Sequence, residues 1–173
     1  MSGTPHNKLS AAELTQRLKG VKLLSLDVDG VMTDGGLYYS NDGSILRKFN
    51  AKDGIGIVSA RAAGVKLAVI SSGSTESIRH RAEALSIDFI RFAVPDKLAA
   101  LEEICAELDI GLDAVAHMGD DTNDVPLLRA IGCPISIADA MPAAQHVAVY
   151  ITEKPGGHGA VREVCDLLVA SRA

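Results

Sequence analysis

Aspartates recur in this sequence at the points where short apolar runs end. Five carboxylates share that position, and they are Asp27, Asp29, Asp120, Asp121 and Asp124. The hydroxyl of Ser72 also follows such a run, and Lys97 opens a stretch with helical periodicity. If the runs are parallel strands, their carboxyl ends meet at one edge of a sheet, where α/β proteins bind ligands. The sequence therefore predicts one pocket that gathers these side chains.

Carboxylates that share one pocket cannot all stay ionised without a compensating cation. Mg²⁺ suits this set, because it takes oxygen ligands from carboxylates, water and a substrate phosphate. Asp27 and Asp29 are two residues apart, so an extended strand aims both at one reacting centre. Lys97, the Ser72 hydroxyl and the backbone amide of Gly73 can bind phosphate oxygens. The pattern indicates a Mg²⁺ site beside a phosphate-binding site.

The elements that must position these residues alternate along the chain. Six short apolar runs are expected to be strands: 21–26, 65–70, 88–90, 114–118, 134–137 and 147–150. Residues 97–108 and 159–170 carry apolar side chains at helical spacing. Alternating strands and helices with short links predict an α/β fold, a doubly wound, Rossmann-like parallel sheet flanked by helices.

One segment interrupts the alternation where the first helix would otherwise begin. Asp42-Gly43 separates two strand-like stretches, residues 37–40 and 44–49, and this pair of residues is typical of a hairpin turn. We therefore expect an inserted β-hairpin with exposed edges that need covering. No cap domain is expected, because the intervals 34–53 and 73–97 are too short to hold one.

The length of 173 residues predicts a single domain over residues 21–173, preceded by an N-terminal arm over residues 1–20. Ser10 and Glu13 match a capping box for a short helix in this arm, over residues 11–18.

Composition excludes several classes of partner. Lys and Arg number 17 against 22 Asp and Glu, and the net charge of −5 argues against a nucleic-acid partner. The apolar runs are far shorter than the ~20 residues that span a bilayer, and the N-terminus shows no secretory signal. Three widely spaced cysteines, Cys105, Cys133 and Cys165, predict neither disulfides nor a metal site. We expect a cytoplasmic protein without a membrane partner.

Four motifs in this order carry a family resemblance: Asp27-Val28-Asp29-Gly30, Ser72, Lys97 and Gly119-Asp120-Asp121-Thr122-Asn123-Asp124. From about residue 21 to residue 170, the chain resembles the phosphatase branch of the haloacid dehalogenase superfamily. Three further segments are similar to a small group in that branch that lacks a cap, and they are residues 29–35, 49–54 and 156–163.

The resemblance implies roles for the motif residues. Asp27 would be the nucleophile that forms an aspartyl phosphate, and Asp29 would protonate the leaving alcohol and then activate water. Mg²⁺ would be held by Asp27, the Asp29 carbonyl and Asp120.

The resemblance also assigns the remaining polar residues. Ser72 and Lys97 would bind the transferring phosphoryl group, while Asp121 and Asp124 would support the metal and Lys97. It further implies a homotetramer in which the tail around residues 157–159 reaches a neighbouring pocket.

The implied substrate is a 2-keto-3-deoxy sugar acid phosphate. The favoured one is the eight-carbon 3-deoxy-D-manno-octulosonate 8-phosphate of lipopolysaccharide biosynthesis. Ser74 follows Gly73 where relatives specific for that sugar carry arginine, so a nine-carbon sialic-acid-type 9-phosphate (of KDN or an N-acylneuraminate) is the alternative. Candidate substrate-binding residues are Asp53, Gly54, Gly73, Arg79 and Arg162.

Two side chains are assigned no direct role in the chemistry: Arg81 is expected on a solvated helix face and His117 in the core. A non-enzymatic phosphoacceptor domain or an idle oligomerisation domain is a further alternative. The order of the motifs argues against the first, and the complete set of polar residues argues against the second.

Overall fold

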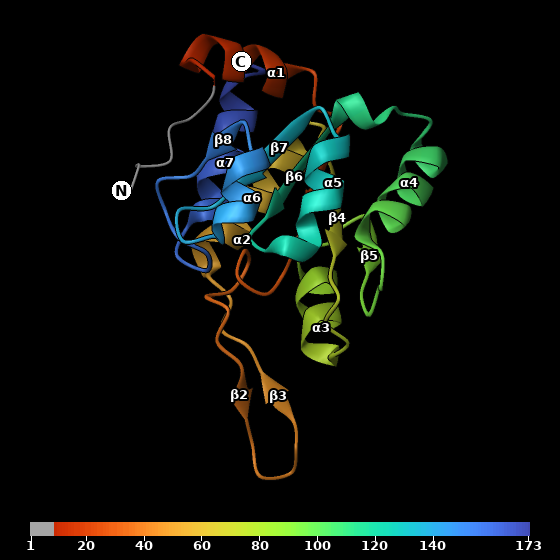
Figure 1. Ribbon diagram of the computed structural model, residues 1–173, viewed down its shortest axis with the longest axis vertical. Helices are drawn as coiled ribbons and strands as arrows, with labels where there is room; N and C mark the ends of the chain where they lie inside the picture. Colours follow the sequence, from red (N-terminus) through yellow and green to blue (C-terminus); the bar gives the residue numbers. More distant parts are fainter. Residues whose placement is uncertain (1–8) are drawn as a thin grey trace.

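The computed structural model describes residues 9–173, so the first eight residues of the expected arm lie outside the described part. Its centre is a six-stranded parallel sheet with the strand order β5-β4-β1-β6-β7-β8 (Figure 1). The strands are β1 (Leu23–Leu26), β4 (Lys66–Ile70), β5 (Phe89–Arg91), β6 (Val115–Gly119), β7 (Cys133–Ser136) and β8 (Tyr150–Ile151). The predicted doubly wound α/β fold is confirmed.

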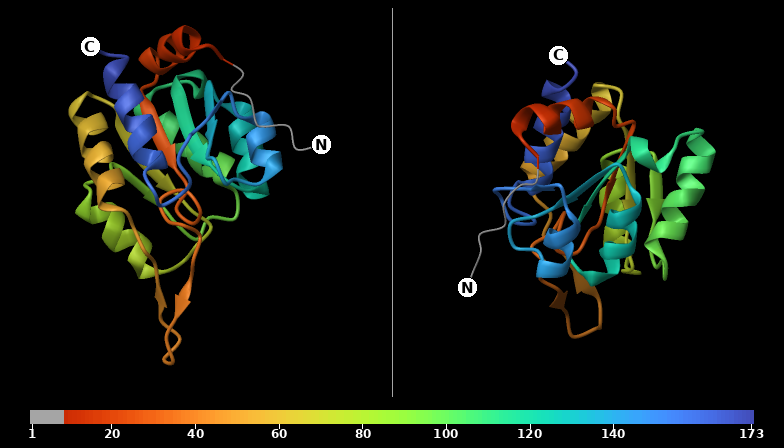
Figure 2. Two further views of the ribbon diagram at one scale, coloured as in Figure 1. Left: turned by 90° about the vertical axis from the view of Figure 1, so that its left-hand side faces the viewer. Right: turned by 45° about the horizontal axis from the view of Figure 1, so that its top comes forward.

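Helices cover both faces of this sheet (Figure 2). They are α1 (Ala11–Lys19), α2 (Ala51–Ala62), α3 (Glu76–Ala84), α4 (Lys97–Leu108), α5 (Val125–Ala130), α6 (Pro142–Val147) and α7 (Ala160–Ala170). Successive residues of β1 face opposite layers: Leu24 packs into the cluster that holds α2 and α7, and Leu23 packs into the cluster that holds α4 and α5. All four β1 residues are buried, as expected of a central parallel strand.

The C-terminal edge of the sheet differs from the expected one. Residues 147–150 were expected to form a strand, but α6 includes Val147 and β8 consists of Tyr150 and Ile151 alone. Pro142 in the first turn of α6 favours a helix start, and the alanines that follow it are strong helix formers. The apolar run was therefore divided between the end of a helix and an edge strand.

The predicted hairpin is present as β2 (Tyr38–Tyr39) and β3 (Ile45–Leu46), with Tyr38 opposite Leu46. It projects away from the body of the molecule (Figure 1). Its apolar side chains are largely exposed, Tyr39 by 69% and Leu46 by 61%. No cap domain lies among residues 9–173.

The helix predicted in the arm is also present. Ser10 caps α1 in a capping box with Glu13, and Gly20 is the C-cap of the helix. Leu14 and Leu18 are buried, and α1 packs against α7. No helix within residues 9–173 is long and apolar enough to cross a membrane.

The loop that follows β8 lies directly on the loop that follows β1. A Cβ atom at Gly156 would lie 1.6 Å from the carbonyl oxygen of Gly30, and the amide of Gly157 donates to the Val31 carbonyl at 3.1 Å. Only glycine permits this approach of two backbones. The C-terminal loop therefore supports the turn that follows Asp29.

Gly156→Ala should destabilise the protein by about 2 kcal/mol or more, because the methyl group would force the two loops apart. Urea unfolding measures this loss. Gly20→Ala is the matched control, since the nearest atom to a Cβ at Gly20 lies at an ordinary contact distance of 3.5 Å. A loss no larger than the control's would show that the two loops are not rigidly packed.

Candidate active site

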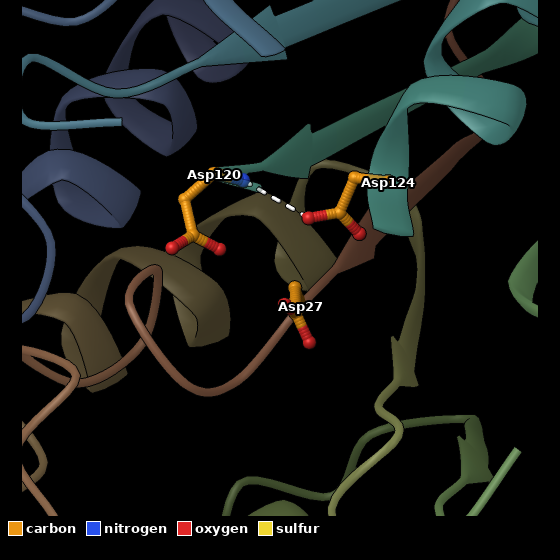
Figure 3. A group of neighbouring side chains, drawn as sticks. All are labelled: Asp27, Asp120 and Asp124. Atoms are coloured by element: carbon orange, nitrogen blue, oxygen red, sulfur yellow. Dashed lines mark hydrogen bonds between the residues drawn. The ribbon is translucent and has the colours of Figure 1, made fainter. Parts of the chain in front are cut away.

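The carboxyl ends of β1, β4 and β6 form a cavity of about 240 Å³. It is lined by Asp27, Asp29, Ser71, Ser72, Gly73, Asp120, Asp121, Thr122 and Asn123. Figure 3 shows Asp27 below Asp120 and Asp124, which come from the end of the neighbouring strand and the turn after it. Of the residues predicted to share one pocket, the lining includes Asp27, Asp29, Ser72, Asp120 and Asp121, whereas Asp124 and Lys97 are buried behind it.

Lys97 connects two of these carboxylates beneath the cavity. Its Nζ lies 2.9 Å from Asp27 Oδ2 and 2.6 Å from Asp124 Oδ1, and all three side chains are buried. Burial acts to lower the pKa of Lys97, but the charges of Asp27 and Asp124 outweigh it and raise the pKa. The lysine is therefore a fixed positive charge. The N-cap of α4 places it there, where the Asp96 side chain accepts the amides of Leu98 and Ala99.

Asp124 organises the turn that follows β6. Its Oδ2 accepts the backbone amides of Asp120 at 3.0 Å and Asp121 at 3.3 Å. Burial acts to raise its pKa, but hydrogen bonding and charge from His117, together with Lys97, lower the pKa overall. His117 is fully buried, as expected, with Nδ1 2.9 Å from the Ser25 hydroxyl and Nε2 3.4 Å from Asp124 Oδ1. Asp124 is thus an ionised carboxylate, and both of its oxygens accept hydrogen bonds from within the protein.

Asp120, unlike Asp124, has a carboxylate oxygen that no protein group contacts by a hydrogen bond. Its Oδ1 is buried and has no hydrogen-bond partner, and burial followed by the charges of Asp27 and Asp124 raises its pKa to about 7. Burial also raises the pKa of Asp27. Gly30, with a φ of +90°, leaves room for the Asp120 carboxylate, because a Cβ there would lie 2.0 Å from Oδ2.

These observations test whether the site suits a cation. Asp27, Asp120 and Asp124 each offer an oxygen, and the three oxygens lie within 4.8 Å of one another. An unpartnered buried carboxylate beside a second one of raised pKa is what a hard divalent ion compensates. The donor set consists of oxygens alone, so it fits Mg²⁺.

An arginine that no sequence motif indicates lies beside this pocket, against Asp29. Arg47, which follows β3, pairs with both oxygens of Asp29: Nε lies 2.6 Å from Oδ1 and Nη2 lies 2.9 Å from Oδ2. Nη1 bonds the hydroxyls of Thr75 and Ser77. The hydrogen bond to Asp29 raises the pKa of Arg47 further. No spacing pattern points to this contact, because it depends on how the hairpin leaves the sheet.

Several predicted substrate-binding residues lie away from this pocket within the chain. Arg79 pairs with Glu76 on the exposed face of α3, and the Arg162 side chain pairs with Asp166. Asp53, in the first turn of α2, is buried against the start of α7, where its Oδ1 accepts the Arg162 amide at 2.8 Å.

A separate groove lies beside α2. Gly54 lines it together with Arg81. The expectation that Arg81 is solvated was wrong, because its guanidinium stacks 5.6 Å from the Phe49 ring centre and donates to the Asn50 carbonyl. Of the predicted substrate-binding set, Gly73 lines the cavity itself.

Comparison with known proteins gives a consistent assignment. Residues 83–164 match the family of haloacid dehalogenase-like hydrolases. Over 162 residues, the chain is 38% identical to the 3-deoxy-D-manno-octulosonate 8-phosphate phosphatase of Yersinia pestis, which covers 94% of this chain and 87% of that protein. The chain belongs to the haloacid dehalogenase-like hydrolases.

Solved structures of this family superpose closely on the fold. The octulosonate phosphatase of Moraxella catarrhalis, in complex with magnesium, phosphate and KDO, matches with a TM-score of 0.90 and 37% identity over 92% of this chain and 91% of that one. A probable phosphatase of the YrbI family from Pseudomonas syringae matches with a TM-score of 0.91 and 41% identity over 92% and 91%. The predicted phosphatase branch is confirmed, and the chain is an enzyme rather than an idle module.

Protons and Mg²⁺ should compete for Asp120. A carboxylate must be ionised to bind the metal, so the apparent Mg²⁺ affinity of the metal-free protein should fall below pH 7 by up to about tenfold per pH unit. Calorimetric titration between pH 5.5 and 8.5 measures it. An affinity that stays flat over this range would contradict the assignment of Asp120 as a ligand.

The Asp120→Asn variant is the companion test. The folded-state pKa of Asp120 is raised above its unfolded value. The contribution of the protonated Asp120 carboxyl to folding stability is therefore complete at low pH and is lost as pH rises through about 7. The variant should therefore unfold at a higher temperature than the metal-free parent at pH 8, and Mg²⁺ should no longer stabilise it.

Proposed function

We propose that this enzyme hydrolyses 3-deoxy-D-manno-octulosonate 8-phosphate with the help of Mg²⁺, as a step in lipopolysaccharide biosynthesis. One observation carries the proposal: the buried Asp27–Lys97 pair lies beside the unpartnered Asp120 oxygen. The relatives that match most of the chain are named as phosphatases of this substrate.

Asp27 is the proposed nucleophile. One of its carboxylate oxygens attacks the phosphorus, the bond to the sugar oxygen breaks, and an aspartyl phosphate results. Lys97 fixes the Asp27 carboxylate through Oδ2 and offers positive charge to the phosphoryl oxygens. Asp27, the Asp29 carbonyl and Asp120 would hold Mg²⁺, which neutralises charge on the phosphoryl group when it is bound.

Asp29 is the proposed acid and base. It gives a proton to the departing sugar oxygen and then takes one from the water that hydrolyses the aspartyl phosphate. Ser72 and the Gly73 backbone, which also line the cavity, bind phosphoryl oxygens. Asp124 acts through others, by fixing Lys97 and the amides of the Asp120 turn. Asp121 flanks the same turn and supports the metal.

Two further expectations belong to this proposal. A cytoplasmic location agrees with three free, buried cysteines. We also propose that the chain consists of an arm over residues 1–20 and one phosphatase domain over residues 21–173.

Kinetics on a panel of phosphate esters test the proposal. We expect kcat/KM for the octulosonate 8-phosphate to exceed that for glucose 6-phosphate by about 100-fold or more, because a site built for a charged group rejects esters that lack it. Asp27→Asn should lower kcat at least about 10³-fold while leaving the fold intact. A clear preference for a nine-carbon 9-phosphate would instead favour the alternative that Ser74 suggests, and equal rates on all esters would refute sugar-acid selectivity.

We also propose a homotetramer. The hairpin is a two-stranded ribbon with exposed apolar side chains, which is marginal alone in water. The groove beside α2, of about 360 Å³, is also apolar, and it includes Ile55 and Val58, which are 57% and 46% exposed. Closed association would cover such surfaces. It would also let Gly54, Arg79, Arg162 and the tail around residues 157–159 serve a neighbouring pocket.

Replacing the cross-strand pair Tyr38 and Leu46 by Lys and Glu should yield monomers with weakened catalysis. Opposite charges preserve the pairing within one hairpin but remove its apolar face. Sedimentation velocity and phosphate release, measured on the same sample, record both effects. Asn41→Lys, at the exposed tip of the same hairpin, is the control. A parent that is fully active while it sediments at 18.1 kDa would refute the assembly.

A further inference from the structure

A histidine in the middle of the sheet contacts the ion pairs of the site from inside the core. His117, in β6, is fully buried, and its two ring nitrogens have different partners. Nδ1 lies 2.9 Å from the Ser25 hydroxyl, and Nε2 lies 3.4 Å from Asp124 Oδ1. A buried polar ring destabilises the fold unless its nitrogens are bonded, so both contacts stabilise His117 in this orientation.

The register of β1 and β6 produces these contacts. Ser25 and His117 are opposite each other in the parallel pair, on the same face as Val115, which belongs to the cluster under α4 and α5. Asp27 lies two positions after Ser25, and its amide continues the pairing by donating to the Met118 carbonyl at 3.0 Å. One strand therefore sets both the proposed nucleophile and the hydroxyl that contacts the histidine.

The contacts connect five side chains that are each at most 4% exposed: Ser25, His117, Asp124, Lys97 and Asp27. This polar chain begins on β1 at Ser25, crosses to β6 and to the start of α4, and returns to β1 at Asp27. Because both of its ends lie on one buried strand, a shift of any member is opposed by the others.

Asp124 is the member that transmits the position of His117 to the reacting groups. Its Oδ1 faces both His117 Nε2 and Lys97 Nζ, whereas its Oδ2 accepts the Asp120 amide. A rotation of this one carboxylate would move Lys97 away from Asp27 and would also move the turn that carries Asp120. The contact with Nε2 opposes that rotation.

The direction of the two hydrogen bonds follows from the charge on Asp124. Its ion pair with Lys97 requires a carboxylate, and a carboxylate only accepts, so the imidazole proton must lie on Nε2. The Ser25 hydroxyl can then donate to Nδ1. In this tautomer His117 makes both contacts without adding a charge to the core.

We propose that His117 is a positioning residue for phosphoryl transfer: supported by Ser25, it fixes the Asp124 carboxylate and, through it, Lys97 and the Asp120 turn. The inference rests on the proposed function, since it takes Asp27 as the nucleophile. His117 itself touches neither the substrate nor the metal. Residues that orient the groups of a metal site from behind change metal affinity or activity by about 10- to 100-fold when they are lost.

The first test measures turnover of p-nitrophenyl phosphate, which reports on the phosphoryl-transfer groups whichever sugar the enzyme prefers. His117→Phe keeps a flat ring and removes both nitrogens, so kcat should fall by about 10-fold or more and KM should change less. Val115→Ala, two positions earlier on the same face, is the control: it should lower the urea midpoint and leave kcat unchanged. A folded His117→Phe variant with the kcat of the parent would overturn the proposal.

Two polar variants separate the contact with Asp124 from the contact with Ser25. The Gln amide reaches the place of Nε2, so His117→Gln should recover most of kcat. The shorter Asn amide reaches only the place of Nδ1, so His117→Asn should stay as slow as His117→Phe. Equal kcat values for the two variants would overturn the proposal, and this comparison decides the question if His117→Phe does not fold.

A double variant tests whether Ser25 acts through His117. Ser25→Ala should lower kcat by about two- to tenfold, the loss of one neutral hydrogen bond. Ser25→Ala combined with His117→Phe should be no slower than His117→Phe alone, because the hydroxyl then has no imidazole to support. Losses that multiply would overturn the proposal.

Two measurements on the metal-free protein do not depend on turnover. Calorimetric titration with Mg²⁺ should give an affinity about 10-fold weaker for His117→Phe than for the parent, because the Asp120 turn loses its support. Nitrogen-15 NMR of the parent should show a proton on Nε2 of His117. An Nε2 without a proton would overturn the proposal, since it could not donate to the Asp124 carboxylate.

The outcomes separate this inference from the proposed function. An Asp27→Asn variant that still turns over refutes the proposed function. An inactive Asp27→Asn variant, together with a His117→Phe variant that keeps the kcat and the Mg²⁺ affinity of the parent, overturns the role of His117 alone.

Discussion

The buried contact of one lysine with two aspartates is the constraint on which the rest of the site depends. Lys97 lies between Asp27 and Asp124 with almost no exposure to solvent. Removing one member of such a buried group leaves an uncompensated charge and costs about 3–5 kcal/mol. One positive and two negative charges leave a net charge of −1, and Asp120 adds a carboxylate whose pKa is already raised. The site is therefore built with an excess of negative charge that a divalent cation offsets.

The sheet topology is what makes this contact possible. The β1 strand lies between β4 and β6, and all three run parallel, so Asp27, Ser72 and Asp120 leave the same edge. Both faces of β1 are packed, which fixes its register, because a slip of one residue would move every β1 side chain to the opposite face of the sheet. The glycine after Asp29 then turns the chain sharply enough to leave space for Asp120. Burial of ordinary aliphatic residues thus sets the position of the reactive carboxylates.

Much of this arrangement could be predicted from local patterns, because each motif residue lies next to the strand or helix that positions it. The aspartates after β1 and β6 and the lysine at the start of α4 are of this kind. The missed contacts join residues that lie far apart in the sequence. Arg47 meets Asp29 across 18 positions, His117 meets Ser25 across 92, and Asp53 meets the Arg162 amide across 109. No periodicity encodes such pairs, since they depend on how finished elements pack.

The hairpin combines exposed apolar strands with a side chain that is fixed beside the cavity. Its outer half exposes aromatic and aliphatic side chains, whereas Arg47, the residue just beyond β3, is fixed beside the catalytic pocket by its ion pair with Asp29. Only five residues lie between Asn41, at the tip, and Arg47, so a surface that covers the ribbon would also restrain the guanidinium. In the proposed tetramer, association would therefore act on Asp29 through a single side chain. The open cavity has no cap among residues 9–173, and this link would let neighbouring subunits influence proton transfer without entering the cavity.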